Sequence, residues 1–335
     1  MQMEMTVNVW VEGRVGQIRL NRPKALNALD LEMVEQVEAA LARFRGMAEV
    51  HAVLVDATGE KAFCAGGDVR AIRAQGMAGE TAPIAAFFEA EYRMNQTIAD
   101  YPKPYVALVD GICLGGGIGI SVHGSHRVAS EHAMFAMPET AIALFPDIGA
   151  TYLLPRMPGA LGMYLALTGT RILGADAVHA GLATHFVSRA RLPALAAAIA
   201  ADGVAVIAAF AEPLPAFTLA PHMPVINAAF SKPSVAEIIA ALEADGSAFA
   251  NETLATLRAL SPSSINWSFK IVSEGAHRTL EECLKAELAL VKKVTLHPEF
   301  FEGVRAVVVD KDRAPKWQPA RLEEVSSAAI DAMFV

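Results

Sequence analysis

Apolar and polar positions alternate in short runs along the first two thirds of the chain. Residues 7–11 and 14–20 alternate with a period of two around Glu12-Gly13, which predicts a β-hairpin. Asp30 precedes an apolar pattern of helical period, which predicts a capped helix that ends near Arg45. We expect further strands at 52–56, 104–109, 126–129, 134–136 and 183–187, and further helices from 69 onward and at 83–100, 155–168 and 174–180. Strands that alternate with helices in this way predict an α/β core.

The pattern changes near residue 220. Prolines stand at 213, 215, 221 and 224, and the segments beyond them have mostly helical periodicity. The helices expected there are 235–242, 249–260, 263–274, 280–294 and 298–309. We therefore predict a core of residues 1–220 followed by a helical C-terminal region of residues 221–335. The apolar run 192–211 is interrupted by Asp202-Gly203, which favours a helix and its neighbour over a membrane span.

Composition and charge narrow the class of protein. Hydrophobic residues make up 53% of the 335 residues and charged residues 19%, so the chain can bury a sizeable core. The net charge is −8 and no basic stripe is present, which argues against nucleic-acid binding. Cys64, Cys113 and Cys283 lack metal-ligand spacing, so we expect buried free thiols, no metal site and a reducing compartment. Because the segment 1–7 shows no signal or transit pattern, we predict a cytoplasmic protein.

Two glycine-rich segments are the first candidates for chemistry. Residues 63–68, within a loop expected over 61–68, and residues 111–117, where a helix is expected to begin, each follow a predicted strand. Glycine lets a backbone N–H approach a ligand closely, and two such amides directed at one oxygen would form an oxyanion hole. The alternative is that each segment is an ordinary tight turn. Neither matches GxGxxG or GxxxxGK(S/T), which disfavours dinucleotide and nucleotide phosphates as ligands.

Three segments, in this order along the chain, resemble the enoyl-CoA hydratase/isomerase (crotonase) superfamily. They are Asn21–Leu29 (NRPKALNAL), Ala65–Asp68 (AGGD) and Gly111–Gly117 (GICLGGG). The resemblance implies a crotonase (ClpP-like) α/β fold, which is a spiral of ββα units, with a helical C-terminal region. It also implies a coenzyme A thioester as substrate, whose thioester oxygen would accept hydrogen bonds from the backbone amides of Gly67 and Gly116.

The resemblance extends to one branch of the superfamily. Ordinary hydratases carry two catalytic glutamates, and this chain has Gly119 at the first position and Glu139 at the second. A further acid, Asp147, follows in the sequence FPDIG. The segments similar to 3-hydroxyisobutyryl-CoA hydrolases are 87–92, 115–149, 302–306 and 310–312. This resemblance covers nearly the whole chain and favours the hydrolase branch over a two-glutamate hydratase.

The branch implies a role for each candidate residue. Glu139 would attack the thioester carbonyl to form an anhydride, or would activate a water that attacks it. Asp147 would bind the substrate hydroxyl or share proton transfer with Glu139, and Glu91 would contact the same polar end. Taken alone, Glu139 is typical of a surface acid, Glu91 of a solvated helix residue and Asp147 of a turn or N-cap residue. The expected contacts with coenzyme A are Lys24, Ala25, Leu26, Ala65 and Arg70, with Lys61 and Arg73 as further cations.

The sequence therefore predicts hydrolysis of 3-hydroxyisobutyryl-CoA, or of a similar short β-hydroxyacyl-CoA, to the hydroxy acid and coenzyme A, as in valine breakdown. Two alternatives stay open: an enoyl-CoA hydratase or isomerase that uses Glu139 alone, and a non-catalytic acyl-CoA-binding protein. No cofactor is expected, because coenzyme A enters with the substrate and leaves as product. Many crotonases are trimers or dimers of trimers, so the resemblance also implies a homo-oligomer, either a trimer or a hexamer.

Overall fold

The computed structural model describes residues 5–335 in two compact units. The first unit comprises the described residues of Met1–Gly67 together with Ala90–Ala136 and Arg171–Phe217. The second unit comprises Asp68–Glu89, Met137–Thr170 and Thr218–Val335. Residues 1–4, part of the segment in which we sought a targeting pattern, lie outside the described residues. The boundary expected near residue 220 stays a prediction.

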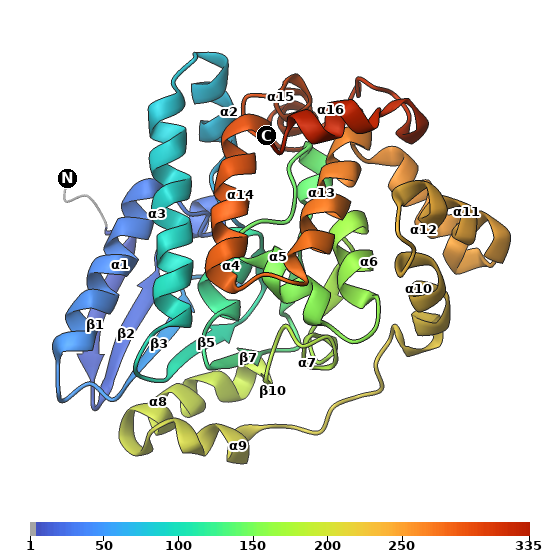
Figure 1. Ribbon diagram of the computed structural model, residues 1–335. Helices are drawn as coiled ribbons and strands as arrows, with labels where there is room; N and C mark the ends of the chain where they lie inside the picture. The colour runs from blue at the N-terminus through green and yellow to red at the C-terminus, as the bar shows by residue number, and fades with distance from the viewer. Residues whose placement is uncertain (1–4) are drawn as a thin grey trace. The chain divides into compact units, whose positions relative to one another are not determined.

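The first unit contains two sheets, and Figure 1 labels the strands of the larger one. The larger sheet has the order β1-β2-β3-β5-β7-β10, with strands Val7–Glu12, Val15–Leu20, Ala52–Ala57, Tyr105–Val109, His126–Ala129 and His185–Phe186. The smaller sheet has the order β4-β6-β8-β9, with strands Ala62–Cys64, Ile112–Leu114, Met134–Ala136 and Ile172–Leu173. β1 and β2 form the predicted antiparallel hairpin, in which Glu12 pairs with Val15. The other neighbouring strands of the larger sheet are parallel.

Successive strands alternate between the two sheets, and this alternation makes a spiral. β3, β5 and β7 belong to the larger sheet, and the strands that follow them in the chain, β4, β6 and β8, belong to the smaller sheet. Helices connect β4 to β5 and β6 to β7, so each turn of the spiral is a ββα unit. The predicted α/β class is confirmed, and the chain has the expected spiral of ββα units.

The larger sheet is buried on one face by α8 (Leu192–Asp202). Leu195 and Ile199 of this helix pack against apolar strand residues such as Leu54, and all three side chains have no exposed surface. Burial of a side chain of this size contributes about 1.5–3 kcal/mol. Further helices of this unit include α4 (Gly116–Val122), α7 (Asp176–His179) and α9 (Ile207–Phe210).

Helix α1 (Leu31–Gly46) lies against β1 and β2, as Figure 1 shows. Asp30 caps it as predicted, because its carboxylate accepts a 2.9 Å hydrogen bond from the backbone amide of Met33. A methyl group on Gly16 would lie 2.5 Å from Cδ2 of Phe44, so a glycine in β2 makes room for this aromatic ring. The polar start and apolar stripe of α1 therefore fix its place on the sheet.

Helices form the second unit. They are α2 (Val69–Met77), α5 (Ala150–Leu153), α6 (Leu161–Thr168), α10 (Met223–Phe230), α11 (Val235–Asp245), α12 (Ala248–Ala259), α13 (Pro262–Gly275), α14 (Leu280–Val294), α15 (Pro298–Val304) and α16 (Ser327–Ala332). Helix α3 (Thr81–Ala99) begins in the second unit and ends in the first. α14 spans the range predicted for it, because Thr279 and Glu282 form a capping box at its start. α10, α11 and α12 follow one another as packed neighbours (Figure 1).

Three predicted elements differ from the structure. The segment 61–68, expected as a loop, contains β4, and the glycine-rich segment 111–119 contains β6 before its helix. Each of these strands has only three residues, too few to show a period. The helix predicted over 155–168 is divided into a 3₁₀ turn, Leu154–Arg156, and α6, because Gly159 has a φ of +59°.

Within residues 5–335, no helix is long and apolar enough to cross a membrane. The same described residues contain no group of three or more His, Cys, Asp or Glu side chains that could hold a metal ion.

Candidate active site

Asn27 organises the loop 21–29 in the first unit. Its side chain is buried and its backbone has a φ of +54°, a conformation that asparagine adopts more readily than most residues. The side-chain amide donates hydrogen bonds of 3.0 Å to the Thr58 carbonyl and 2.9 Å to the Ala62 carbonyl. Its side-chain oxygen accepts a 2.8 Å bond from the Arg22 amide. This motif residue therefore ties the loop to the end of β3 and the start of β4.

The two glycine-rich segments lie together in the first unit. Gly66 has a φ of +101°, and a methyl group there would lie 3.2 Å from the Leu114 carbonyl oxygen and 3.7 Å from the Gly116 amide nitrogen. A methyl group on Gly116 would lie 3.4 Å from the Gly67 amide nitrogen. Gly116 is the first residue of α4, where the backbone N–H has no acceptor within the helix. The fold thus brings the Gly67 and Gly116 amides close to each other.

Glu91 lies beside these amides on the inner face of α3. Its side chain is buried, and its Oε1 occupies the space that a side chain on Gly116 would need. The other buried residues of this helix include Ile84, Met94 and Ile98. Glu91 thus interrupts an apolar stripe of helical period and is not a solvated helix residue.

The cysteines of the first unit are structural. Cys64 and Cys113 are buried, and burial raises the pKa of the Cys64 thiol to about 12 and that of Cys113 well above its usual range. A thiol with such a pKa is not a nucleophile at neutral pH. Both cysteines lie in the glycine-rich segments, but they serve to fill space in the core and not as nucleophiles.

The residues expected to contact coenzyme A are divided between the units. In the first unit, Lys24 and Leu26 line a cavity of about 420 Å³ together with Lys61. Lys24 is exposed, whereas Ala25, Leu26 and Ala65 are partly buried. Arg70 is exposed on α2 of the second unit. The structure therefore places two of the expected cations, Lys24 and Lys61, in one cavity.

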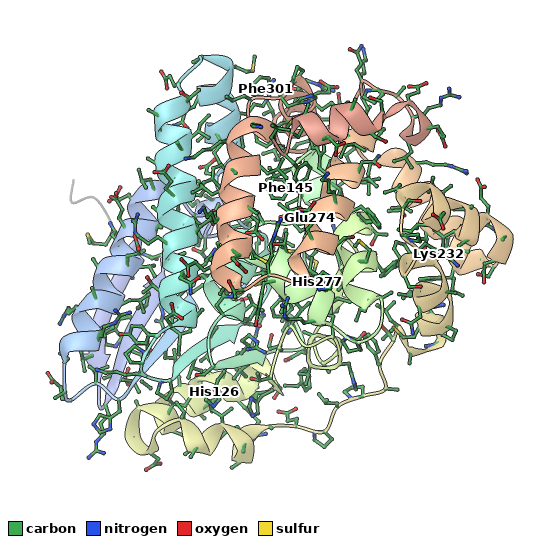
Figure 2. All side chains as sticks on the ribbon, in the orientation of Figure 1. His126, Phe145, Lys232, Glu274, His277 and Phe301 are labelled. Carbon is green, nitrogen blue, oxygen red and sulfur yellow. The ribbon has the colours of Figure 1, made fainter. Side chains whose placement is uncertain are left out.

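Glu139 opens a 3₁₀ turn, Glu139–Ile142, in the second unit. The side chain is buried, with 5% of its surface exposed. The turn is closed by Ala143 at a φ of +53°, and the Leu144 amide donates a 2.9 Å bond to the Glu139 carbonyl. Phe145, labelled in Figure 2, follows with no exposed surface. Glu139 is therefore held by a tight, buried turn and is not a surface acid.

The C-terminal segment 302–312 supports this turn. A side chain on Gly303 would lie 2.6 Å from the backbone of Ile142, so α15 approaches the turn as closely as glycine allows. Arg305 pairs with Glu302 at 2.8 Å, Asp310 at 2.7 Å and Asp312 at 2.6 Å. In the segment 302–312, Gly303 thus makes a packing contact, and Arg305 forms an ion-pair cluster with three acids.

Asp147 is buried at the start of a strained loop in the second unit. Only 4% of its surface is exposed. The next residue, Ile148, has a φ of +58°, and Gly149 has a φ of +80°. A β-branched residue rarely takes a positive φ, and such a conformation costs about 1–3 kcal/mol unless neighbouring contacts hold it.

Glu287, which the sequence analysis missed, provides contacts that hold this loop. Its Oε2 accepts a 2.7 Å hydrogen bond from the Gly149 amide, and its Oε1 accepts 3.1 Å and 2.5 Å bonds from the Thr151 amide and hydroxyl. Burial, together with the smaller effect of the nearby charge of Asp147, raises the pKa of Glu287 to about 8. The signal in the sequence was an acid on the apolar stripe of α14, between Leu284 and Leu290.

The candidate residues are divided between the two units. The first unit brings together Gly67, Gly116 and Glu91, with the coenzyme A candidates Lys24, Ala25, Leu26 and Ala65 in the same unit. The second unit contains Glu139 and Asp147, eight residues apart in the chain, and adds Glu287 beside Asp147. The first unit offers backbone donors and the buried carboxylate of Glu91, and the second unit offers the buried carboxylates of Glu139, Asp147 and Glu287.

Comparison with known proteins decides the family. Residues 15–334 match the family described as enoyl-CoA hydratase/isomerase. The chain belongs to this family. Among curated family members, the mitochondrial 3-hydroxyisobutyryl-CoA hydrolase of Xenopus tropicalis is 46% identical to it over 334 residues. The human protein of the same name is 44% identical over 336 residues, and both alignments cover 96% of this chain and 86% of the relative.

Solved structures of the enoyl-CoA hydratase/isomerase family share the whole fold. A carnitinyl-CoA dehydratase from Mycobacterium thermoresistibile has a TM-score of 0.95 at 40% identity, and an enoyl-CoA hydratase from Rhodobacter sphaeroides 2.4.1 has 0.93 at 38%. Each comparison covers 99% of this chain and 97% of the other. The crotonase fold predicted from the sequence is confirmed.

The predicted cytoplasmic location is wrong. The two curated relatives of the enoyl-CoA hydratase/isomerase family, from Xenopus tropicalis and human, are named as mitochondrial proteins. The lack of a signal or transit pattern in residues 1–7 does not specify a compartment, and buried free cysteines suit several of them. The expectations of no cofactor and no metal stay predictions.

Proposed function

We propose that this protein hydrolyses the thioester of 3-hydroxyisobutyryl-CoA, or of a similar short β-hydroxyacyl-CoA, to the hydroxy acid and coenzyme A. The observation that carries the proposal is 42–46% identity, over nearly the whole chain, to several enzymes named for this reaction. Because one fold can host several reactions, the residues must support it too. Three carboxylates support the reaction, those of Glu91, Glu139 and Asp147. All three are buried, whereas an acid that serves only as a surface residue would be solvated.

In this proposal the Gly67 and Gly116 amides bind the thioester oxygen. The support is their close approach in the first unit and the glycine at each position, which lets a ligand reach the backbone. As the carbonyl carbon becomes tetrahedral, negative charge develops on this oxygen. One such donor typically lowers the barrier by about 3 kcal/mol, so the pair supplies a large part of the rate enhancement.

Glu139 is the proposed catalytic carboxylate. It either attacks the thioester carbonyl and expels the coenzyme A thiolate, leaving an anhydride that water cleaves, or removes a proton from the attacking water. The tight turn around Glu139 supports both routes, because it limits the positions that the carboxylate can take. Borohydride added during turnover would reduce an anhydride to an alcohol at Glu139. A mass shift in the Glu139 peptide is therefore the mark of the first route.

Asp147 and Glu91 are the proposed ligands of the acyl group. A carboxylate accepts a hydroxyl hydrogen bond strongly, so either acid suits the β-hydroxyl of the substrate. Asp147 has the alternative role of sharing proton transfer with Glu139. Substrates that lack the hydroxyl separate these roles. Loss of a group that binds the hydroxyl should lower the rate only with the hydroxylated substrate. Loss of a proton-transfer group should lower the rate with both substrates.

A second candidate function is hydration of an enoyl-CoA. It is favoured by the two solved structures with TM-scores of 0.95 and 0.93, which are described as a dehydratase and a hydratase. Against it stands Gly119, which has no carboxylate at the position of the first hydratase glutamate. A single acid, Glu139, is left to move both protons that water addition requires.

The test is to incubate the purified protein with 3-hydroxyisobutyryl-CoA and, separately, with crotonyl-CoA. Hydrolysis releases a free thiol, whereas hydration removes the enoyl absorbance without releasing one. We expect thiol from the first substrate and a stable absorbance with the second. Loss of enoyl absorbance without thiol release would overturn the proposal in favour of hydration, and binding of both substrates without turnover would overturn it in favour of a binding protein.

The proposed partner is the acyl-CoA itself, with coenzyme A as product and no further cofactor. The lysine-lined cavity beside loop 21–29 supports binding of the coenzyme A phosphates by Lys24 and Lys61. A trimer or hexamer stays part of this proposal. Analytical ultracentrifugation of the purified chain would test it.

A further inference from the structure

Glu287 is an acid at a core position of the second unit. On α14 it shares the buried stripe with Cys283, Leu284, Leu290 and Val291, and its side chain has no exposed surface. A carboxyl group is costly to bury unless its oxygens have partners. A packing role alone would therefore be served better by leucine or methionine, so the partners of Glu287 matter.

Both oxygens of Glu287 bind the loop that follows Asp147. Oε2 accepts from the Gly149 amide at 2.7 Å, and Oε1 accepts from the Thr151 amide at 3.1 Å and its hydroxyl at 2.5 Å. The Gly149 amide belongs to the peptide that follows Ile148. The bond to Glu287 thus fixes the peptide next to the residue with the unusual φ of +58°.

The conformation of this loop needs an external support. Ile148 and Gly149 both have a positive φ, and isoleucine adopts such a φ only where surrounding contacts hold it. Ile148 is buried, which restrains its side chain, and the Glu287 carboxyl restrains the backbone on its C-terminal side. If this restraint is lost, relaxation of Ile148 rotates the backbone that carries Asp147.

We propose that Glu287 is a positioning residue that orients Asp147 toward the β-hydroxyl of the acyl group. This inference rests on the hydrolase function proposed above. Glu287 acts through the loop and does not touch the reacting atoms. Its charge interaction with Asp147, which raises the pKa of Glu287, places the two carboxyl groups within electrostatic range and supports this relation.

The hydrogen-bond pattern requires a carboxyl group and excludes a carboxamide. Each oxygen of Glu287 accepts from one backbone N–H, so a glutamine in either orientation would place its NH₂ group against the Gly149 or the Thr151 amide. A protonated glutamic acid keeps every contact, because its O–H can donate to the Thr151 hydroxyl. Glu287→Gln therefore disrupts the loop with almost no change in side-chain volume.

The experiment compares thiol release from 3-hydroxyisobutyryl-CoA and from isobutyryl-CoA, which lacks the hydroxyl. We expect Glu287→Gln to lower the preference for the hydroxylated substrate in kcat/KM by about tenfold or more, since small misplacements of a binding group have effects of this size. Asp147→Asn should lower the same preference. In the double variant the two losses should not add, because both act on one interaction.

Two further variants separate positioning from general stability. Glu212 of the first unit also accepts from a backbone amide and a hydroxyl, those of Ser188 at 3.1 Å and 2.7 Å. Glu212→Gln should keep the wild-type preference. If Glu287→Gln does not fold, Thr151→Val removes one of the three bonds and should lower the preference by a smaller factor, and Thr151→Ser should restore it.

Additive losses in the double variant, or an unchanged preference in Glu287→Gln and in Thr151→Val, would overturn the inference while leaving the proposed function intact. Failure of the proposed function is distinguishable, because the wild type would then release no thiol from either substrate. In that case crystal structures of the wild type and Glu287→Gln decide whether Glu287 holds the loop. A change of the Ile148 φ to a negative value in the variant supports a role of Glu287 in holding the loop. An unchanged loop overturns that role.

Discussion

The side-chain amide of Asn27 donates a 2.9 Å hydrogen bond to the carbonyl oxygen of Ala62, and this bond joins the N-terminal motif loop to the first strand of the smaller sheet. The segment that follows this strand carries Gly66 and Gly67. The motif NRPKALNAL thus acts through the fold, because its buried asparagine holds the backbone that leads to the proposed oxyanion donor Gly67.

Asn27→Ala should lower the free energy of unfolding by about 2–4 kcal/mol, because three hydrogen bonds of a buried side chain are lost and two carbonyls lose a donor. Asn27→Gly should cost less, since glycine accepts the φ of +54° without strain. Urea unfolding measures both. Asn251→Ala, which removes one exposed bond to the Gly246 carbonyl, is the control. A change in Asn27→Ala no larger than in this control would contradict the account.

Gly116→Ala should reduce kcat/KM for thiol release by about 100-fold, because the variant keeps its backbone N–H but the added methyl group shifts this donor away from the thioester oxygen. The added methyl group would collide with the Glu91 carboxylate and lie 3.4 Å from the Gly67 amide nitrogen. Gly46→Ala is the matched control, because nothing lies within 4 Å of a methyl group there. Wild-type kinetics in Gly116→Ala would mean that this amide takes no part in the reaction.

The three cysteine thiols should not react with a thiol reagent in the folded protein. Cys64, Cys113 and Cys283 are all buried, and burial raises the pKa of each thiol. Titration with Ellman's reagent should detect almost no protein thiol before guanidinium is added and three per chain afterwards. Rapid reaction of even one thiol under native conditions would show that its surroundings are more open than the structure indicates.

Glu287 should make folding less favourable as pH rises. Since its pKa is raised from 4.5 to about 8, the folded chain binds this proton more tightly than the unfolded chain between these pH values. The stabilisation is complete below about pH 4.5 and is lost as pH rises to about 8, with a slope of at most about 1.4 kcal/mol per pH unit. Urea unfolding from pH 5 to pH 9 should show a shallower pH dependence for Glu287→Gln. Identical slopes for the two proteins would contradict the raised pKa.

Motif residues were predictable because their signals are local in the chain. The segments that contain Asn27, Gly67, Gly116 and Glu139 were recognised from short stretches of sequence, and the periods of two and 3.6 predicted most strands and helices, while the catalytic roles of Gly67, Gly116 and Glu139 stay predictions. The three-residue strands β4 and β6 were missed because they are held by pairing between distant segments, and no period can show in three residues.

Long-range contacts explain what else the sequence could not show. Glu287 meets Gly149 across 138 positions, and only its place on an apolar stripe hinted at a role. Glu91 carried the same hint on α3, but the spacing alone could not separate a buried acid from a solvated one. An acid that falls on the apolar stripe of a predicted helix is therefore worth treating as a candidate site residue.

Free-thiol release from 3-hydroxyisobutyryl-CoA, measured for the wild type beside Glu139→Gln, tests thioester hydrolysis and the role of Glu139 together. Glutamine keeps the size of the side chain but is neither a nucleophile nor a base of comparable strength. We expect rapid release by the wild type and a loss of about 100-fold or more in the variant, with coenzyme A binding unchanged. Equal rates in the two proteins, or no release by a folded wild type that binds coenzyme A, would contradict this expectation.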